Sequence, residues 1–251
     1  MVVILLNWAY VSAISFLFGF GLLHLLTNRE LEEGEPRPAL PLVILAGLAV
    51  TACLANLMSL VINLGLLANI LLILAGAAVG SWLRQPILEY LRKTFVKLHW
   101  LHWLTILAFL AVAGVVLLKS TTLPENYDTG LYHAQAIRWI ETFPAVAGLG
   151  NLADRLVFNS SWLIISALFS FSFFGLPSLH SLNGLIALLV TGYALSKFNR
   201  LYKGEILVTT WLAIALPFLL RRIFSLELSS PGTDLPAALM VWVVILKLQV
   251  S

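Results

Sequence analysis

Charged residues are scarce in this sequence. Only 11% of its 251 residues are Asp, Glu, Lys or Arg, whereas soluble domains carry about 25%. Hydrophobic residues make up 60% of the chain, and the mean hydropathy is +0.96. At least seven helix-length apolar runs are separated by short polar breaks, which is more than a water-soluble core accommodates. The composition excludes an ordinary soluble protein and predicts an all-α polytopic membrane protein.

Cysteine is almost absent as well. The single cysteine, Cys53, excludes an intrachain disulfide, and its thiol is expected to pack inside an apolar run. No phosphate-binding GxxxxGK motif is present. The net charge of +3 comes from basic residues in short loops, where they set membrane topology. We therefore expect membrane lipids as partners and no nucleic acid, and the oligomeric state stays open.

The apolar runs predict about seven transmembrane helices. A long run at 40–83 breaks near Asn63-Leu64-Gly65 and is interpreted as a hairpin of two helices. The segment 84–100 has basic and apolar residues at helical spacing, which predicts an interfacial helix. Gly76 and Gly80 are spaced for close helix packing. The remaining spans are predicted at Val2–Leu26, 101–118, 182–195, 206–224 and 235–248.

The orientation follows from the distribution of Lys and Arg. The apolar segment 161–176 is about 24 Å long as a helix, short for a hydrocarbon core of about 30 Å. If it crosses the membrane, eight basic residues lie inside and seven outside; if it does not, the counts become ten and five. The second topology obeys the positive-inside rule better. It predicts an outer N-terminus and a 161–176 helix that lies at the outer interface or dips into it.

This topology gathers polar side chains at the outer surface. The segment 127–142 contains no proline, and Phe143-Pro144 supplies a stop, so a helix is expected there. On such a helix Asp128, Tyr132, Gln135 and Trp139 form one stripe, and His133 points away from it. A carboxylate, a phenol, an amide and an indole on one face resemble a carbohydrate-binding surface.

The order of these motifs resembles GT-C class glycosyltransferases, which use polyprenyl-phosphate-linked sugars. The resemblance rests on YDTGLYHAQAIRWI, on GLGNLADRLVFNSSW and on the Thr-Asp at 233–234, and it covers about residues 100–248. It implies an N-terminal three-span region at 1–99 and a GT-C-like core at 100–251. It also implies a site at the outer face of a cell inner (cytoplasmic) membrane.

The resemblance assigns roles to residues of this chain. The acids Asp128 and Asp234 are the expected catalytic residues. Two features depart from the family pattern, because the paired Asp-Glu is Asp128-Thr129 here and a Lys-Pro-Pro is replaced by 158–161. The family continues beyond the point where this chain stops, so the chain is expected to be an N-terminal part. The substrate-binding residues are expected to be Tyr132, His133, Gln135, Trp139, Asn159, Arg221 and Arg222.

The expected reaction moves a sugar from a lipid phosphate to an acceptor. Asp128 would remove the proton of the acceptor hydroxyl as general base. Arg221 and Arg222 would stabilise the leaving phosphate. Carboxylates suit Mg²⁺ or Mn²⁺, but two distant acids leave any metal requirement open.

Each residue also has a structural interpretation. Asp128 and Asp234 precede helices and are suited to N-capping. The arginines suit lipid anchoring and the aromatic residues an interfacial belt. His133 suits a structural hydrogen bond. Two other functions also stay open, a noncatalytic subunit and a flippase or transporter component of a cell-surface polysaccharide system.

Overall fold

The computed structural model describes residues 1–27, 38–95, 103–157, 160–201, 215, 218–221 and 227–250. Within these ranges the regular elements are all helical, which confirms the expected all-α class. The N-terminal helices are α1 (Val2–Thr27), α2 (Leu40–Ser59), α3 (Leu66–Trp82), α4 (Arg84–Phe95) and α5 (Trp103–Ser120). The connecting segment contains η2 (Thr129–His133), α6 (Ala134–Thr142), η3 (Leu149–Asn151), η4 (Asp154–Val157), α7 (Ser161–Leu168) and η5 (Ser172–Phe174). Two further helices follow, α8 (Leu182–Leu201) and α10 (Asp234–Val250).

Two helices are long and apolar enough to cross a membrane, Val2–Leu26 and Leu40–Ser59. A third span results if α3 and α4 are counted together, although the chain bends by 81° between them. The other apolar helices are shorter, at Thr105–Ser120, Ser161–Phe174 and Leu182–Ser196. The described residues thus contain two or three membrane-length helices, fewer than the seven expected spans, and most of the predicted span 206–224 lies outside them.

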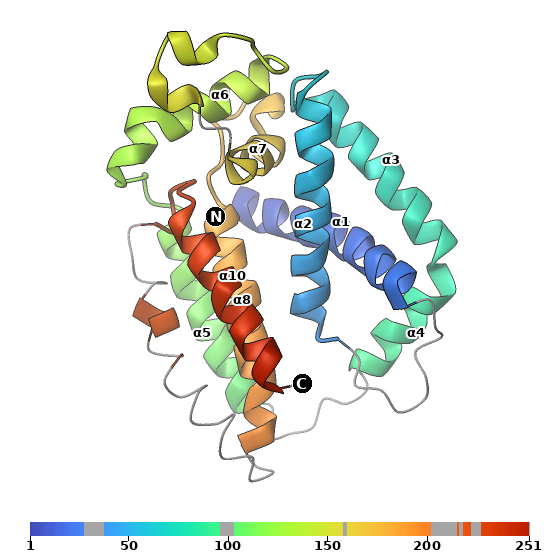
Figure 1. Cartoon of the computed structure of the whole chain (residues 1–251). Coiled ribbons are helices and arrows are strands. Elements are labelled where there is room, and N and C mark those ends of the chain that lie inside the picture. Colours follow the sequence, from blue (N-terminus) through green and yellow to red (C-terminus); the bar gives the residue numbers. More distant parts are fainter. Residues whose placement is uncertain are drawn as a thin grey trace.

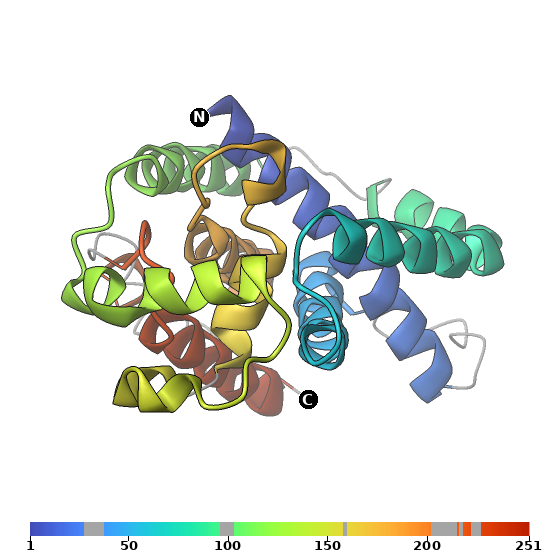
Figure 2. The same cartoon turned by 90° about the horizontal axis from the view of Figure 1, so that it is seen from above.

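The helices form two groups that pack against each other through α2 and α8 (Figures 1 and 2). Figure 1 shows α5, α8 and α10 side by side on one flank and α1 to α4 on the other. The α6 and α7 segment lies at one end of both groups. The last residue of α5 and the first residues of α8 and α10 are at that same end. The chain therefore leaves and re-enters the long helices on one side.

Helices α1 and α2 cross with their backbones in contact. A Cβ atom added at Gly47 would lie 1.6 Å from the carbonyl oxygen of Ser15, and one at Gly19 would lie 1.9 Å from that of Val43. A Cβ atom added at Gly76 or Gly80 would instead lie 3.2 to 3.5 Å from the nearest side-chain tips of Ile14 and Leu17. Close backbone approach through small residues thus occurs at the α1–α2 crossing.

The turn between α2 and α3 is bonded to the end of α6. The Asn63 Nδ2 donates to the Glu141 carbonyl at 2.9 Å, and the Leu64 N–H donates to the Ile140 carbonyl at 3.0 Å. The Ala145 N–H donates to the Ser59 carbonyl at 2.8 Å. The predicted break near Asn63 is confirmed, and it lies at the same end as the 127–157 segment.

Helix α4 begins directly after α3 and packs back against α1. Its Ile87 and Tyr90 are buried with Phe20 and Val43, and the Tyr90 hydroxyl donates to the Pro38 carbonyl at 2.9 Å. The helix predicted over 84–100 is therefore present through Phe95, and 96–100 lie outside the described residues. Cys53 on α2 is exposed, so the expectation that its thiol packs inside the protein was wrong.

The 161–176 segment differs from the expected interfacial helix. Helix α7 has only eight residues, and its residues 163–168 are buried by α2 and α6. At 1.5 Å per residue it is about 12 Å long, too short to span a membrane. After α7, Phe171 and Gly175 flank η5 in left-handed backbone conformations, with φ of 58° and 77°. Helix α7 is thus an inserted element held inside the protein, whereas residues 174–176 are exposed.

Asparagines from α1 and α3 bind the carboxyl end of α7. The Asn7 Nδ2 donates to the Phe169 carbonyl at 2.7 Å, and the Asn69 Nδ2 donates to the Leu168 carbonyl at 3.0 Å. Both asparagines are buried, and their Oδ1 atoms accept from the hydroxyls of Ser181 and Tyr10. The last carbonyls of a helix have no partner within it, so these amides allow α7 to end among long apolar helices.

Replacing Asn69 with leucine of similar volume should destabilise the protein. The Leu168 carbonyl would stay buried without this donor, which costs about 1–3 kcal/mol. The measurement is denaturant unfolding of the detergent-solubilised protein, followed by circular dichroism. Asn151→Leu is the matched control, because Asn151 is exposed on η3. Equal unfolding of the two variants would contradict the role of the Asn69 amide.

The fold also predicts which loops share a side of the membrane. In a Cys53→Ser background, single cysteines at Ala153 and Leu176, both exposed, should react alike with a membrane-impermeant thiol reagent in intact cells. A cysteine at Lys93 on α4 should behave in the opposite way, because α4 lies at the other end (Figure 1). Opposite reactivity of positions 153 and 176 would mean that the α7 segment crosses the membrane.

Candidate functional site

The predicted helix over 127–142 contains a π-helical turn. The turn, η2, covers Thr129–His133, and the Ala134 N–H bonds to the Thr129 carbonyl five residues back. This widened turn shifts the side chains that follow it relative to a regular α-helix. Buried positions recur every four residues, at Thr129, His133, Ile137 and Glu141. His133 therefore lies on the buried face, beside rather than opposite the expected stripe.

Asp128 does not cap this helix. Its N–H donates to the Asn126 Oδ1 at 2.9 Å, so Asn126 performs the capping, and the carboxylate makes no capping bond. The Asp128 Oδ1 instead lies 3.4 Å from the Arg155 Nη1, with both side chains about half exposed. The Arg155 guanidinium carbon lies 5.6 Å from the centre of the Tyr132 ring. Asp128, Arg155 and Tyr132 therefore form a charged and aromatic group at the surface.

Asp234, in the first turn of α10, lies near enough for its charge to act on Tyr132 and His133. The loop before it is fixed to η2, because the Thr129 Oγ1 and the Ser230 Oγ are hydrogen-bonded at 2.6 Å. The Asn183 Nδ2 on α8 donates to the carbonyls of Glu227 and Gly232, at 2.9 and 3.1 Å. These bonds bring two acids that are far apart in the sequence to one place.

Both acids affect the pKa values of two neighbouring side chains, Tyr132 and His133. Burial raises the pKa of the Tyr132 phenol, Asp128 and Asp234 raise it further, and Arg155 opposes them. Burial lowers the pKa of the His133 imidazole, and the same two carboxylates act against this shift without reversing it. The two rings lie 4.2 Å apart between their centres. Near neutral pH the site thus has a neutral phenol and a neutral imidazole beside two carboxylates.

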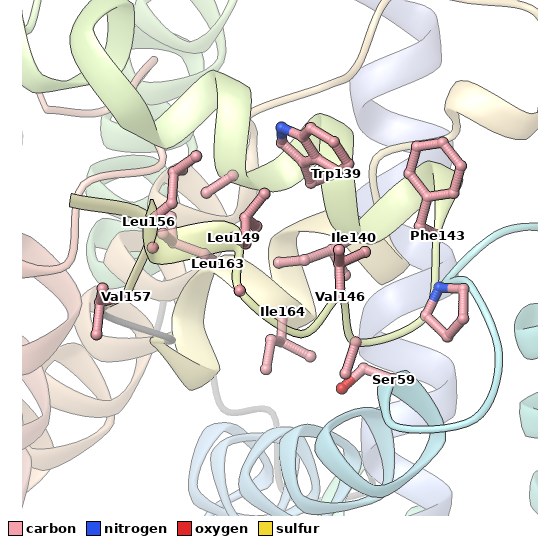
Figure 3. Close-up of a pocket in the computed structure, with 15 residues that line it drawn as sticks. Ser59, Trp139, Ile140, Phe143, Val146, Leu149, Leu156, Val157, Leu163 and Ile164 are labelled. Atoms are coloured by element: carbon pink, nitrogen blue, oxygen red, sulfur yellow. The ribbon is translucent and has the colours of Figure 1, made fainter. Parts of the chain in front are cut away.

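Other predicted site residues lie elsewhere or outside the described ranges. Gln135 is exposed on α6. Trp139 lines an apolar pocket between α6, α7 and the 143–157 segment (Figure 3). Arg221 is exposed, and the described contacts include no ion pair between it and either carboxylate. Asn159 and Arg222 fall outside the part of the chain that the structure describes.

Three residues near the carboxylates were missed from the sequence. Arg155 lies within the motif GLGNLADRLVFNSSW and Ser230 lies just before the Thr-Asp at 233–234, but neither residue was given a role, and Asn183 was not singled out. Asn183 also accepts a hydrogen bond from the Trp162 Nε1 at 3.0 Å, which links α7 to the loop before Asp234. A buried asparagine in an apolar helix was the one signal that could have pointed to it, since an unpaired amide there is costly.

A second group of polar residues is buried behind the site. The Glu141 Oε2 accepts from the Ser178 hydroxyl at 2.9 Å and lies 3.6 Å from the Arg138 Nη1. Among the described residues, neither the Glu141 Oε1 nor the Nδ1 atoms of His133 and His180 have a hydrogen-bond partner. Burial lowers the pKa of His180, Glu141 acts in the opposite direction, and His133 lowers it slightly more.

The described residues do not form a recognisable metal site. No three His, Cys, Asp or Glu side chains among them are grouped as metal ligands. The Asp128 carboxylate is already paired with a guanidinium. We therefore assign no chemistry at these carboxylates to a metal ion.

Comparison with known proteins identifies the family. The chain belongs to the family described as Domain of unknown function (DUF8201), whose profile matches residues 1–250. No curated protein and no solved structure matches the chain.

The buried imidazoles make the stability depend on pH. Because the pKa values of His133 and His180 are lower in the folded protein than the ordinary value near 6.5, the unfolded chain binds more protons just below that pH. Stability should therefore decrease as the pH falls through this range. Melting temperatures in detergent at about pH 7.5 and about pH 5.5 test this.

Variants of the two histidines show whether they cause the pH dependence of the melting temperature. His133→Gln and His180→Gln should each reduce the loss of melting temperature between the two pH values. A pH dependence that is unchanged in both variants would show that other groups cause it.

Proposed function

We propose that this DUF8201 protein is a membrane glycosyltransferase that moves a sugar from a polyprenyl-phosphate-linked donor to an acceptor. The convergence of Asp128 and Asp234 around Tyr132 and His133 carries the proposal. The two acids come from segments 106 positions apart (234 − 128). Two acids beside a phenol and an imidazole form a site suited to handling protons and hydroxyl groups.

The carboxylates suit proton transfer from a sugar or other hydroxyl. In the proposed reaction Asp128 accepts the proton of the acceptor hydroxyl, and the oxygen of that hydroxyl forms a bond to the anomeric carbon of the sugar. The bond between the anomeric carbon and the phosphate oxygen of the donor breaks at the same time. Asp234 orients the acceptor or donor hydroxyls. The neutral phenol of Tyr132 donates or accepts a hydrogen bond in the same site.

The leaving phosphate requires positive charge. Arg155 is the described arginine nearest to the two acids, since it pairs with Asp128 and lies against Tyr132. Its planar guanidinium suits phosphate oxygens. We propose that Arg155 exchanges its contact with Asp128 for the phosphate when donor binds, which frees the carboxylate for the acceptor. Arg221 and Arg222 remain candidates for stabilising the same phosphate.

At Thr129 this chain departs from the GT-C pattern. Where that family has a second acid, this chain has a hydroxyl that bonds to Ser230 before α10. A residue at that position thus connects the two acid-bearing segments directly. We further propose that this end of the protein faces outward from the inner membrane, where the positive-inside rule puts the segments after α5.

The activity test uses purified protein in detergent with radiolabelled polyprenyl-phosphate-linked hexoses and pentoses. The wild type should release or transfer the sugar of at least one donor. Asp128→Asn should lower the rate by about 100- to 10,000-fold, as expected for loss of a general base. Asp154→Asn is the matched control, because Asp154 is an exposed acid of the same outer segment.

The same assay separates the other candidate functions. A flippase component would move the donor across vesicle membranes and show no sugar release in detergent. A noncatalytic subunit would release no sugar from any donor. Equal rates for the wild type and Asp128→Asn, with both folded by circular dichroism, would exclude Asp128 as the base.

A further inference from the structure

The loop 227–233, which leads into α10, is buried although the acid that follows it is exposed. Residues 228–232 are all buried, whereas Asp234 reaches the surface. The loop forms turns rather than a helix, so its buried carbonyl groups need hydrogen-bond donors from other parts of the protein. The groups that donate to the loop therefore determine where Asp234 lies.

One side chain of α8 donates to this loop near both of its ends. The Asn183 Nδ2 donates to the Glu227 carbonyl at 2.9 Å and to the Gly232 carbonyl at 3.1 Å. Asn183 is 1% exposed, so water does not compete for these two bonds. The amide thus holds the loop against α8, which α10 contacts along its side (Figure 1).

The orientation of this amide is fixed from α7. The Trp162 Nε1 donates to the Asn183 Oδ1 at 3.0 Å. An indole N–H can only donate and a backbone carbonyl can only accept. If the amide turned over, its NH₂ group would face the indole N–H and its oxygen would face the two carbonyls. A single orientation therefore satisfies all of these groups.

The loop is also joined to η2. The hydroxyls of Thr129 and Ser230 are hydrogen-bonded at 2.6 Å, and the Ser230 Oγ accepts from the Gly232 N–H at 3.1 Å. A Cβ atom added at Gly232 would lie 3.9 Å from the Nδ2 of Asn126, just before η2. The loop is thus fixed from two sides, by α8 and by η2.

We propose that Asn183 is a positioning residue of the candidate site, which holds Asp234 beside the imidazole of His133. The part of Asn183 in catalysis rests on the proposed sugar transfer, in which Asp234 orients a substrate hydroxyl. Among the described contacts, the hydrogen bonds of Asn183 go to the loop and to Trp162 and not to either acid. It therefore acts through the position of Asp234.

The pKa of His133 reports the position of Asp234 without an assay of activity. The carboxylates of Asp128 and Asp234 both raise this pKa, against the effect of burial. Tyr132 and His180 also lie near the ring, and the variants below leave them in place. The measurement is a pH titration of the detergent-solubilised protein, followed by NMR of isotope-labelled histidine. His133→Gln identifies the signal of this residue.

Asn183→Leu should lower the pKa of His133 further below its ordinary value, because Asp234 is no longer held beside the ring. In an Asp234→Asn background the same replacement should leave this pKa unchanged, because no charge remains to be displaced. A purely structural effect would change the pKa in both backgrounds. Ser230→Ala removes the contact with Thr129 and should give the same pattern, also if Asn183→Leu does not fold.

Asn69→Leu is the matched control. Asn69 is another buried helix amide that donates to a backbone carbonyl, at the end of α7. Its replacement should leave the pKa of His133 unchanged. In the transfer assay, Asn183→Leu should lower the rate by about 100-fold, since a displacement of about 1 Å in a catalytic site can cost this much.

Four outcomes decide the proposal. An unchanged pKa of His133 in both Asn183→Leu and Ser230→Ala would overturn it. An equal fall of this pKa in Asn69→Leu would also overturn it, because the fold would then have loosened generally. The expected pKa pattern with an unchanged rate would overturn the part of Asn183 in catalysis. The same pattern in a protein that transfers no sugar would support the positioning of Asp234 and contradict the proposed function.

Discussion

The fold depends on satisfying the carboxyl end of a short helix among long apolar ones. Helix α7 ends where no water is expected, so its last carbonyls need donors from the protein. Asn7 on α1 and Asn69 on α3 supply them. Since α7 can end there, the chain turns back and starts α8 at the end of the molecule where α5 finishes (Figure 1). Without these two amides the segment would have to extend into a span or leave the interior.

The same arrangement places the candidate site. Trp162 on α7 bonds to Asn183 on α8, and Asn183 holds the loop that leads into α10. That loop is bonded to η2 through Thr129 and Ser230. A continuous set of buried hydrogen bonds thus runs from the inserted helix to both acids. Buried bonds of this kind are costly to break, because an unpaired polar group cannot turn to water.

Helix α6 separates two environments. Its buried polar face presents His133 and Glu141, and its other side presents Trp139 to an apolar pocket. The π-turn before it shifts the residues after Asp128 relative to a regular helix. The segment that bears Asp128 and the pocket are therefore joined by one helix but have different linings.

Local patterns in the sequence predict the helical class, the break at Asn63 and the helix that ends before Phe143, and the structure confirms all three. Apolar run length, turn residues and proline act locally, so a sequence reports them directly. Only the tertiary structure decided that α7 is an inserted helix, that His133 faces the acids, that Arg155 pairs with Asp128 and that Trp139 lies in a separate pocket. Each of these depends on contacts between residues far apart in the chain, such as Asn69 with Leu168 and Thr129 with Ser230. Hydropathy and spacing contain no information about such partners.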